Sequence, residues 1–401
     1  MKQFLSVQTL LLIGFSLCSW NWYSAANHRP TLPQFNDAPR TIRPEYDNPF
    51  VVSDEQLRQV LAKTQPRFLK KPTKVNFIDH GIRLWGSQVE FSDDSIDGPE
   101  MLNVLLDDRE FRKKWGENAP ALLRHTDTGI GVLTQQGRTT VSHVDHMMGT
   151  LAEIGVPLSK EVITRDGTGH VSDLLKDAVL NFQLNQREYE WTALAAAFYV
   201  VDASPWYSDE GQKIDFDTMA VRIMRQRQPL GVCYGQHRLY TLVMLLRIDE
   251  QIRNESFTGL LSDSMVGRVK DYLFETTRSL YRTQSLEGYW DGNWPDTKLE
   301  IPDPSTDELS RRILATGHVL EWWAMAPDEL HPPRESIVRG AQWLARVIVE
   351  MDQQQIEKNY TFLTHAARSL ALWRGKFADE VELDYPSQSE QFISTTNKAR
   401  E

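Results

Sequence analysis

The chain has 401 residues and carries 44 basic against 55 acidic side chains, a formal net charge of −11. Binding to nucleic acid needs a basic surface, so this balance argues against nucleic acid as a partner. Two cysteines, Cys18 and Cys233, exclude an internal disulfide framework, because Cys18 falls in the leader. Twelve tryptophans and 16 phenylalanines are enough for a large apolar core.

The first 26 residues form a hydrophobic leader. Lys2 is its only charged side chain, an apolar stretch follows, and Ser24 to Ala26 fit the small-residue cleavage site of a signal peptide. The uncharged run from Gln3 to Asn27 is also long enough to span a bilayer. Both a signal peptide and a membrane anchor through residues 4–26 therefore stay open. Each predicts export to the cell envelope or periplasm, or secretion.

Residues 27–52 predict an extended, proline-rich linker, since five prolines occur there among few large apolar residues. A single helical domain is expected over residues 53–380. The polar residues 381–401 predict a flexible tail.

Two kinds of helix are expected to alternate within the domain. One kind carries a single apolar stripe, typical of a helix with one buried face. The striped segments are residues 53–66, 101–115, 171–183, 216–227, 266–280 and 337–351. The other kind is apolar nearly all round and has to be covered on every side. These segments are residues 74–85, 141–154, 190–201, 237–248, 316–326 and 361–373.

The alternation predicts an all-α fold, an (α/α)6 toroid of six helical hairpins with the apolar helices as the inner ring. Near the start of these helices lie His80, His146, His237, His318 and His365, with Glu190 and Trp191 in the equivalent place of the sixth. Three of the intervals are about 46 residues, the length of one helix pair. Successive inner helices would be parallel, so these side chains would gather at one opening.

This arrangement predicts acid–base chemistry. The positive end of a helix dipole favours neutral imidazole, the form that a general base or a metal ligand requires. Carboxylates in such apolar segments are costly to bury unless paired, so they either assist the histidines or form structural ion pairs with Arg238 or Arg368. The histidines could instead cap neighbouring helices. The predicted catalytic residues are His318, His365, His237, His146, His143, His80, Glu190, Glu321 and Asp145.

A metal site is a weaker alternative, and no metal ligand is predicted. Cys233 and His237 are four residues apart, which suits two ligands on one helical turn, and His318 or His365 would have to complete a zinc site. The alternative is a buried, unreactive cysteine. The cofactor is left open.

The sequence GYWDGNW at 288–294 surrounds a carboxylate with aromatic side chains, a combination that suits stacking on a sugar. The predicted substrate-binding residues are Tyr234, Trp290, Asp291 and Trp294. The alternative is a loop whose tryptophans cover the outside of the domain.

Gln284, Gly288 and Trp290 form the pattern Q-x-x-x-G-x-W, with Leu280 four residues before the glutamine. It resembles the QW motif of the terpenoid cyclase and protein prenyltransferase superfamily of helical toroids. That resemblance implies a link between helices that stiffens the barrel.

Gly317, His318, Glu321 and Trp322 form G-H-x-x-E-W. This is similar to a motif of the N-acylglucosamine 2-epimerase family, another (α/α)6 barrel. The resemblance implies that His318 moves protons on a sugar, with His365 as its partner. The run from Cys233 to Gly235 resembles the segment that carries a zinc-ligand cysteine in lanthionine cyclases.

The sequence thus favours an exported toroid enzyme that acts on a carbohydrate-like, polar small molecule by histidine and carboxylate chemistry. A non-catalytic ligand-binding or scaffold module of the cell envelope, and a zinc-dependent enzyme, are the alternatives. The substrate and the oligomeric state are left open.

Overall fold

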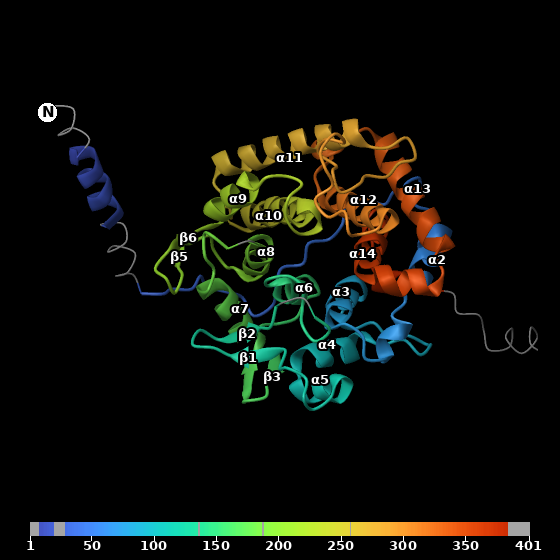
Figure 1. Ribbon diagram of the computed structural model, residues 1–401, viewed down its shortest axis with the longest axis horizontal. Helices are drawn as coiled ribbons and strands as arrows, with labels where there is room; N and C mark the ends of the chain where they lie inside the picture. Colours follow the sequence, from blue (N-terminus) through green and yellow to red (C-terminus); the bar gives the residue numbers. More distant parts are fainter. Residues whose placement is uncertain (1–7, 20–28, 135–136, 187, 257, 384–401) are drawn as a thin grey trace, which may run out of the picture. The chain divides into compact units, whose positions relative to one another are not determined.

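The computed structural model describes residues 8–19, 29–134, 137–186, 188–256 and 258–383, and these are mostly helical (Figure 1). The β structure in named strands is limited to three two-stranded antiparallel sheets within these residues. The predicted all-α class is therefore confirmed. The chain divides into two compact units. Unit 1 comprises Met1–Ile42, Leu106–Arg112 and Asn118–Leu273, and unit 2 comprises Arg43–Leu105, Lys113–Glu117 and Phe274–Glu401.

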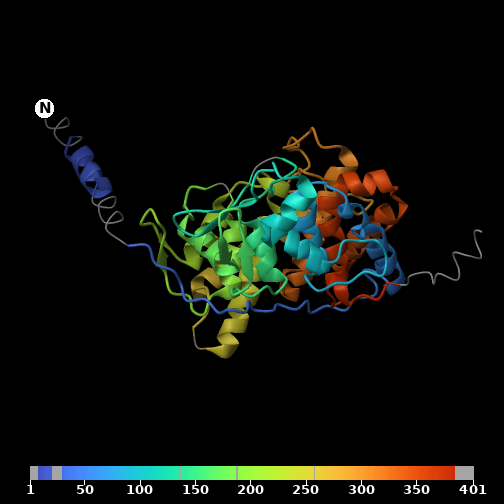
Figure 2. The same ribbon diagram turned by 90° about the horizontal axis from the view of Figure 1, so that it is seen from below.

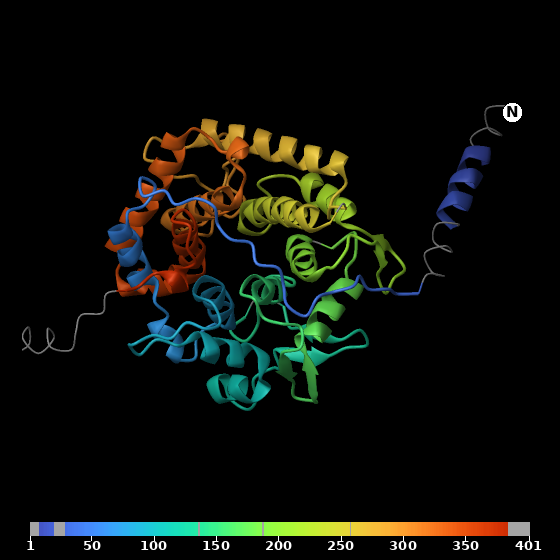
Figure 3. The same cartoon turned by 180° about the vertical axis from the view of Figure 1, so that it is seen from behind.

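Unit 1 is built around three buried helices. Helix α8 packs against both α6 and α10 (Figure 3), and all ten of its residues are buried. The helices are α6 (His146–Glu153), α7 (Val171–Leu180), α8 (Glu190–Tyr199), α9 (Phe216–Arg225), the short η2 (Val232–Gly235), α10 (Gln236–Glu255), and the first parts of α5 (Asp108–Trp115) and α11 (Asp263–Thr283). The strands are β1 (Leu123–His125) with β2 (Ile130–Val132), β3 (Glu161–Ile163) with β4 (Thr168–His170), and β5 (Trp206–Tyr207) with β6 (Lys213–Ile214).

Unit 2 has the same plan, with α14 packed against both α3 and α12. Its helices are α2 (Asp54–Thr64), η1 (Arg67–Lys70), α3 (Val75–Trp85), α4 (Gly98–Leu106), α12 (Glu308–Met325), η3 (Asp328–Leu330), α13 (Arg334–Glu350), α14 (Gln353–Leu372), η4 (Ala378–Glu380) and the second parts of α5 and α11. The Ser53 hydroxyl and the Gln56 side chain form the capping box that starts α2.

The three buried helices of unit 2 are parallel. The Ser310 hydroxyl at the start of α12 donates to Asn359 on α14. Further along, Gly317 lies against Ala366. The pairing thus advances in the same direction along both helices. Asn76 and His80 of α3 meet residues 361 and 365 of α14 in the same order. The prediction that neighbouring apolar helices start at the same end is therefore correct within this unit.

The alternation of buried and striped helices is also correct, with two local differences. The striped segment 101–115 is two helices, α4 and α5, because Asp107 between them forms a bridge to Ile163. The apolar segment 141–154 becomes helical only at His146, so His143 lies in the preceding loop. Closure of six hairpins into a toroid, and the single domain over 53–380, stay predictions.

The described residues of the proline-rich segment form no helix and run beside the helices (Figure 2). In unit 1 the backbone NH groups of Asn36 and Arg40 donate to the carbonyls of Tyr199 and Phe198, each at 2.8 Å. In unit 2 the Tyr46 hydroxyl donates to the Ala326 carbonyl at 2.6 Å. The segment is therefore part of the fold rather than a free spacer.

The transmembrane prediction for the leader is wrong. Residues 8–19 are helical, but over the described residues no helix combines the length and the apolarity needed to cross a membrane. A spanning helix needs about 20 consecutive apolar residues. The structure likewise gives the signal-peptide assignment no support, and its cleavage motif, Ser24 to Ala26, lies outside the described residues. An exported location stays a prediction.

Candidate functional site

Glu321 is the centre of a buried charged cluster in unit 2. One carboxylate oxygen accepts from Arg83 on α3 at 2.7 Å and from Arg368 on α14 at 2.6 Å. The other lies 2.7 Å from Nδ1 of His365, also on α14. The Glu321 and Arg83 side chains are 2% and 3% exposed and that of Arg368 is 8% exposed, so the ion pairs are sealed from water. The cluster joins all three buried helices of the unit.

The tautomer of His365 follows from its two neighbours. Its Nδ1 is also 3.2 Å from Arg83, which can only donate, whereas ionised Glu321 can only accept. The contact with Glu321 is shorter, so Nδ1 carries the proton and donates a hydrogen bond to the carboxylate. The basic nitrogen of neutral His365 is therefore Nε2.

Two more histidines lie beside His365. The ring of His318 stacks on it with centroids 3.9 Å apart, and the ring of His80 meets it edge-on at 5.5 Å. Nδ1 of His318 lies 2.7 Å from the Leu314 carbonyl and Nδ1 of His80 lies 2.8 Å from the Asn76 carbonyl. A carbonyl only accepts, so Nδ1 is protonated in both rings. All three neutral imidazoles thus have Nε2 as the basic atom.

Glu321 is held ionised. Burial by itself would raise the pKa of its carboxyl, but the charges of Arg83 and Arg368, with a smaller contribution from His318, lower that pKa below its ordinary value. One carboxylate facing two guanidinium groups leaves a net positive charge when the histidines are neutral. The cluster therefore contains a fixed anion in direct contact with the His365 ring.

A spacing in the sequence could have identified the whole cluster. Each of the three buried helices carries a histidine followed three residues later by a charged residue. That charged residue is Glu321 on one helix and an arginine that donates to Glu321 on the other two. The pairs are His80 with Arg83, His318 with Glu321, and His365 with Arg368. Residues three apart share one helix face. The ion pair with Arg368 was one of the expected alternatives, whereas Arg83 was missed.

The other three predicted histidines gather in unit 1, around Trp191 of α8. The Trp191 ring is 4.3 Å from the His146 ring on α6 and 4.9 Å from the His237 ring on α10, measured between centroids. His143, in the loop before α6, is 5.1 Å from His237 and 5.6 Å from His146. Trp191 stands at the position that a histidine has in the other apolar helices, and its ring contacts the rings of both His146 and His237.

The carboxylates near this group are protonated more readily than usual. Burial raises the pKa of Asp145 to about 6, and the Thr192 hydroxyl donates to its carboxylate. Burial also raises the pKa of Glu190, although the Arg238 charge opposes this. Glu190, the first residue of α8, accepts from the Tyr189 backbone NH at 2.8 Å. Arg238 itself donates to the Leu230 carbonyl.

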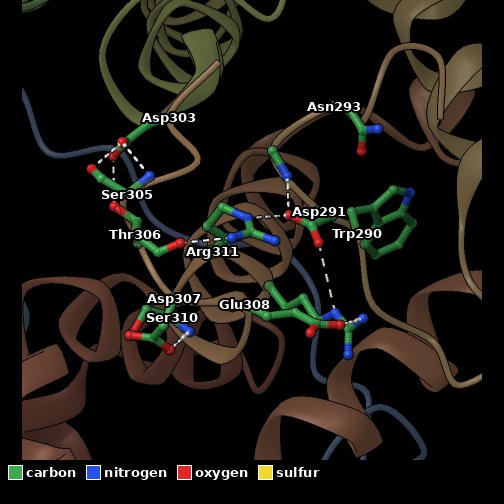
Figure 4. A network of polar contacts seen from close by, with 12 residues as sticks. Trp290, Asp291, Asn293, Asp303, Ser305, Thr306, Asp307, Glu308, Ser310 and Arg311 are labelled. Atoms are coloured by element: carbon green, nitrogen blue, oxygen red, sulfur yellow. Dashed lines mark hydrogen bonds and ion pairs between the residues drawn. The ribbon is translucent and has the colours of Figure 1, made fainter. Parts of the chain in front are cut away.

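The GYWDGNW loop of unit 2 makes mainly structural contacts. Trp290 and Trp294 are each 1% exposed. The Trp290 indole donates to the Leu280 carbonyl at 2.8 Å. Asp291 accepts from Arg311 at 2.9 Å and from the Gly292 backbone NH at 2.6 Å, within a network at the start of α12 (Figure 4). The Trp290 and Trp294 side chains are buried, and sugar binding here stays a prediction.

The QW-like residues join neighbouring elements of unit 2. The Gln284 amide donates to the carbonyls of Gly288 and Ser336 at 2.7 and 2.8 Å, and its oxygen accepts from Arg339 at 2.7 Å. The loop after α11 is thereby tied to α13.

The remaining predicted substrate-binding residue, Tyr234, is buried in η2 with a left-handed backbone, φ 55°. The nine predicted catalytic residues are divided between the two units. Unit 2 holds His80, His318, His365 and Glu321; unit 1 holds His143, His146, His237, Asp145 and Glu190.

No family model, no curated protein and no solved structure matches this chain.

Proposed function

We propose that this protein is an enzyme that transfers protons on a carbohydrate-like, polar substrate, with His365 and His318 as the acid–base pair. The observation that carries the proposal is the Glu321–His365 contact, in which an ionised, buried carboxylate fixes the proton on Nδ1. In such dyads the carboxylate orients the imidazole and stabilises the imidazolium that forms when Nε2 takes a proton. The two arginines keep Glu321 charged throughout.

The stacked His318 is the second member of the acid–base pair. Two imidazoles with ring centroids 3.9 Å apart resist carrying charge together, because like charges at short range disfavour each other. Protonation of one ring therefore lowers the proton affinity of the other. A pair in which only one ring at a time carries the added proton can remove a proton and return one in the same turnover.

The substrate class rests on the resemblance of residues 317–322 to the G-H-x-x-E-W motif. Its His318 and Glu321 are the residues that meet His365 in this cluster. Sugars and their derivatives carry exchangeable C–H groups next to a carbonyl, which matches a site built for proton transfer. The complete (α/α)6 toroid is part of the same proposal, supported by the alternating helices and by the Gln284 contacts.

Deuterium incorporation tests the proposal. The full chain is incubated in D2O with a panel of reducing sugars, N-acylated amino sugars and uronic acids, and the loss of C–H signals is followed by NMR. Wild type should exchange a carbon-bound proton in at least one of them. His365→Gln and His318→Gln should each slow exchange by about 10²–10⁴, the usual contribution of a general acid or base.

The matched control is His125→Gln, an exposed histidine of β1, which should leave the exchange rate unchanged. Circular dichroism establishes that every variant is folded. Undiminished exchange in folded His365→Gln, or a panel in which wild type exchanges no proton, would contradict the proposal.

A binding module without catalysis is the second candidate. It is favoured by the Nδ1 contacts of His80 and His318 with carbonyls of their own helices, since structural histidines are satisfied in the same way. Calorimetry with the same sugar panel separates the two functions. Saturable binding without deuterium incorporation would favour the module.

A further inference from the structure

We propose that unit 1 contains a metal site formed by His143, Cys233 and His237, with zinc as the ion that this ligand set favours. One donor atom from each residue lies within 4.8 Å of the other two. His143 and His237 are buried and Cys233 is half-buried. Two imidazoles and a thiolate are the ligand types that zinc prefers. Its three ligands are different residues from His318, His365 and Glu321 of the proposed proton-transfer function.

The three ligands come from segments far apart in the chain. His143 precedes α6, Cys233 belongs to η2, and His237 is in the first turn of α10. The rings of His143 and His237 meet nearly at right angles, at 86°. In a tetrahedral site with the usual zinc–nitrogen and zinc–sulfur bonds the donor atoms are about 3.3–3.6 Å apart. Small side-chain rotations would bring the three donor atoms to that separation.

The backbone around the ligands is strained. Among the residues that the structure describes, the non-glycine residues with positive φ are Asp145, Cys233 and Tyr234. Asp145 lies two residues after His143, Cys233 is itself a proposed ligand, and Tyr234 follows it. Left-handed backbone at ordinary residues is kept where the surroundings require it, and it concentrates at ligand sites. Here it turns the chain sharply just before α10, which brings Cys233 close to His237.

Nearby charges suit a bound cation and a thiolate. A carboxylate oxygen of Glu188 lies 3.6 Å from Nδ1 of His143 and accepts from the Val144 backbone NH at 3.0 Å. Metal-bound histidines commonly direct their second nitrogen to a carboxylate, which leaves Nε2 of His143 for the metal. The Arg238 guanidinium lies against Gly231 and Gly235, on either side of Cys233, where positive charge favours the thiolate.

Three protein ligands leave a fourth tetrahedral position for water or a substrate atom. This is the coordination of catalytic zinc, whereas structural zinc usually has four protein ligands. The site would therefore bind an exchangeable ligand.

Metal analysis of the purified full chain tests the site. Protein prepared without chelators should contain close to one zinc per chain. Replacing zinc by Co2+ should give the intense near-ultraviolet band of thiolate-to-cobalt charge transfer. Cys233→Ser should remove this band, and His237→Gln should lower the metal content at least tenfold. The controls Cys18→Ser and His125→Gln change exposed residues of the same types and should keep both signals.

Wild type that holds no stoichiometric metal and gives no charge-transfer band with added Co2+ would overturn the proposal. So would a band that persists in Cys233→Ser. If Cys233→Ser does not fold, the metal content of His143→Gln tests the site instead. A folded His143→Gln variant with undiminished metal content would contradict the proposal. Metal content and spectrum do not depend on turnover, so they are informative even if sugar exchange fails.

Discussion

Replacement of Glu321 by glutamine should strongly destabilise unit 2. The glutamine keeps the size of the side chain but removes the negative charge that Arg83 and Arg368 share. Both guanidinium groups are at least nine-tenths buried, so water cannot replace the lost carboxylate. Breaking a buried ion pair from one side typically costs about 3–5 kcal/mol. Two cations depend on this carboxylate, so we expect a loss of at least about 3 kcal/mol in the free energy of unfolding.

The assay is urea unfolding followed by tryptophan fluorescence and far-ultraviolet circular dichroism. Because the chain has two compact units, a free energy is derived only from a transition in which both signals coincide. The control Glu350→Gln changes an exposed carboxylate on α13 and should stay within about 0.5 kcal/mol of wild type.

A double variant tests whether the loss of stability comes from the buried arginine charges. Adding Arg368→Met to Glu321→Gln removes one of the two buried cations that faced the lost carboxylate, so the double variant should be more stable than Glu321→Gln alone. A loss below about 1 kcal/mol for Glu321→Gln, or a double variant that is less stable than the single one, would refute this account.

Three further changes in unit 2 have defined outcomes. Asp307→Ala removes the N-cap of α12 and should cost about 1 kcal/mol in urea unfolding. The Lys358 hydrogen bond lowers the pKa of Asp307 to about 2. The ionised Asp307 carboxylate therefore stabilises the fold fully above about pH 4, and this stabilisation is lost as the pH falls toward 2. The difference in free energy of unfolding between wild type and Asp307→Asn, measured at a series of pH values, should shrink over this range. Trp290→Ala should cost about 3–5 kcal/mol because the side chain is fully buried, and an unchanged thermal midpoint would contradict this. Gly288→Ala should cost more than 1 kcal/mol, since φ is 113° and a Cβ would collide with the Arg339 carbonyl; wild-type stability would show that the loop can move.

The pattern of the sequence predicted the helices well because burial depends on local spacing. A segment such as 190–199, with no polar face, cannot be stable at a surface, and the structure buries all of it. The spacing of His318 and Glu321 likewise places both on one face of any helix that contains them. Residues that break a helix for a long-range reason were not predictable: Asp107 separates α4 from α5 because it pairs with Ile163.

The amino-acid sequence by itself therefore determined the helical class, the two kinds of helix, and which histidines and carboxylates would be buried. Only the tertiary structure decided which of them meet. Arg83 and Glu321 are 238 positions apart, and no local pattern links them. Their contact depends on α3 and α12 both packing on α14, and that choice is made by the fit of whole helix faces. The same holds for His143, which reaches His237 from a loop rather than from the helix expected there.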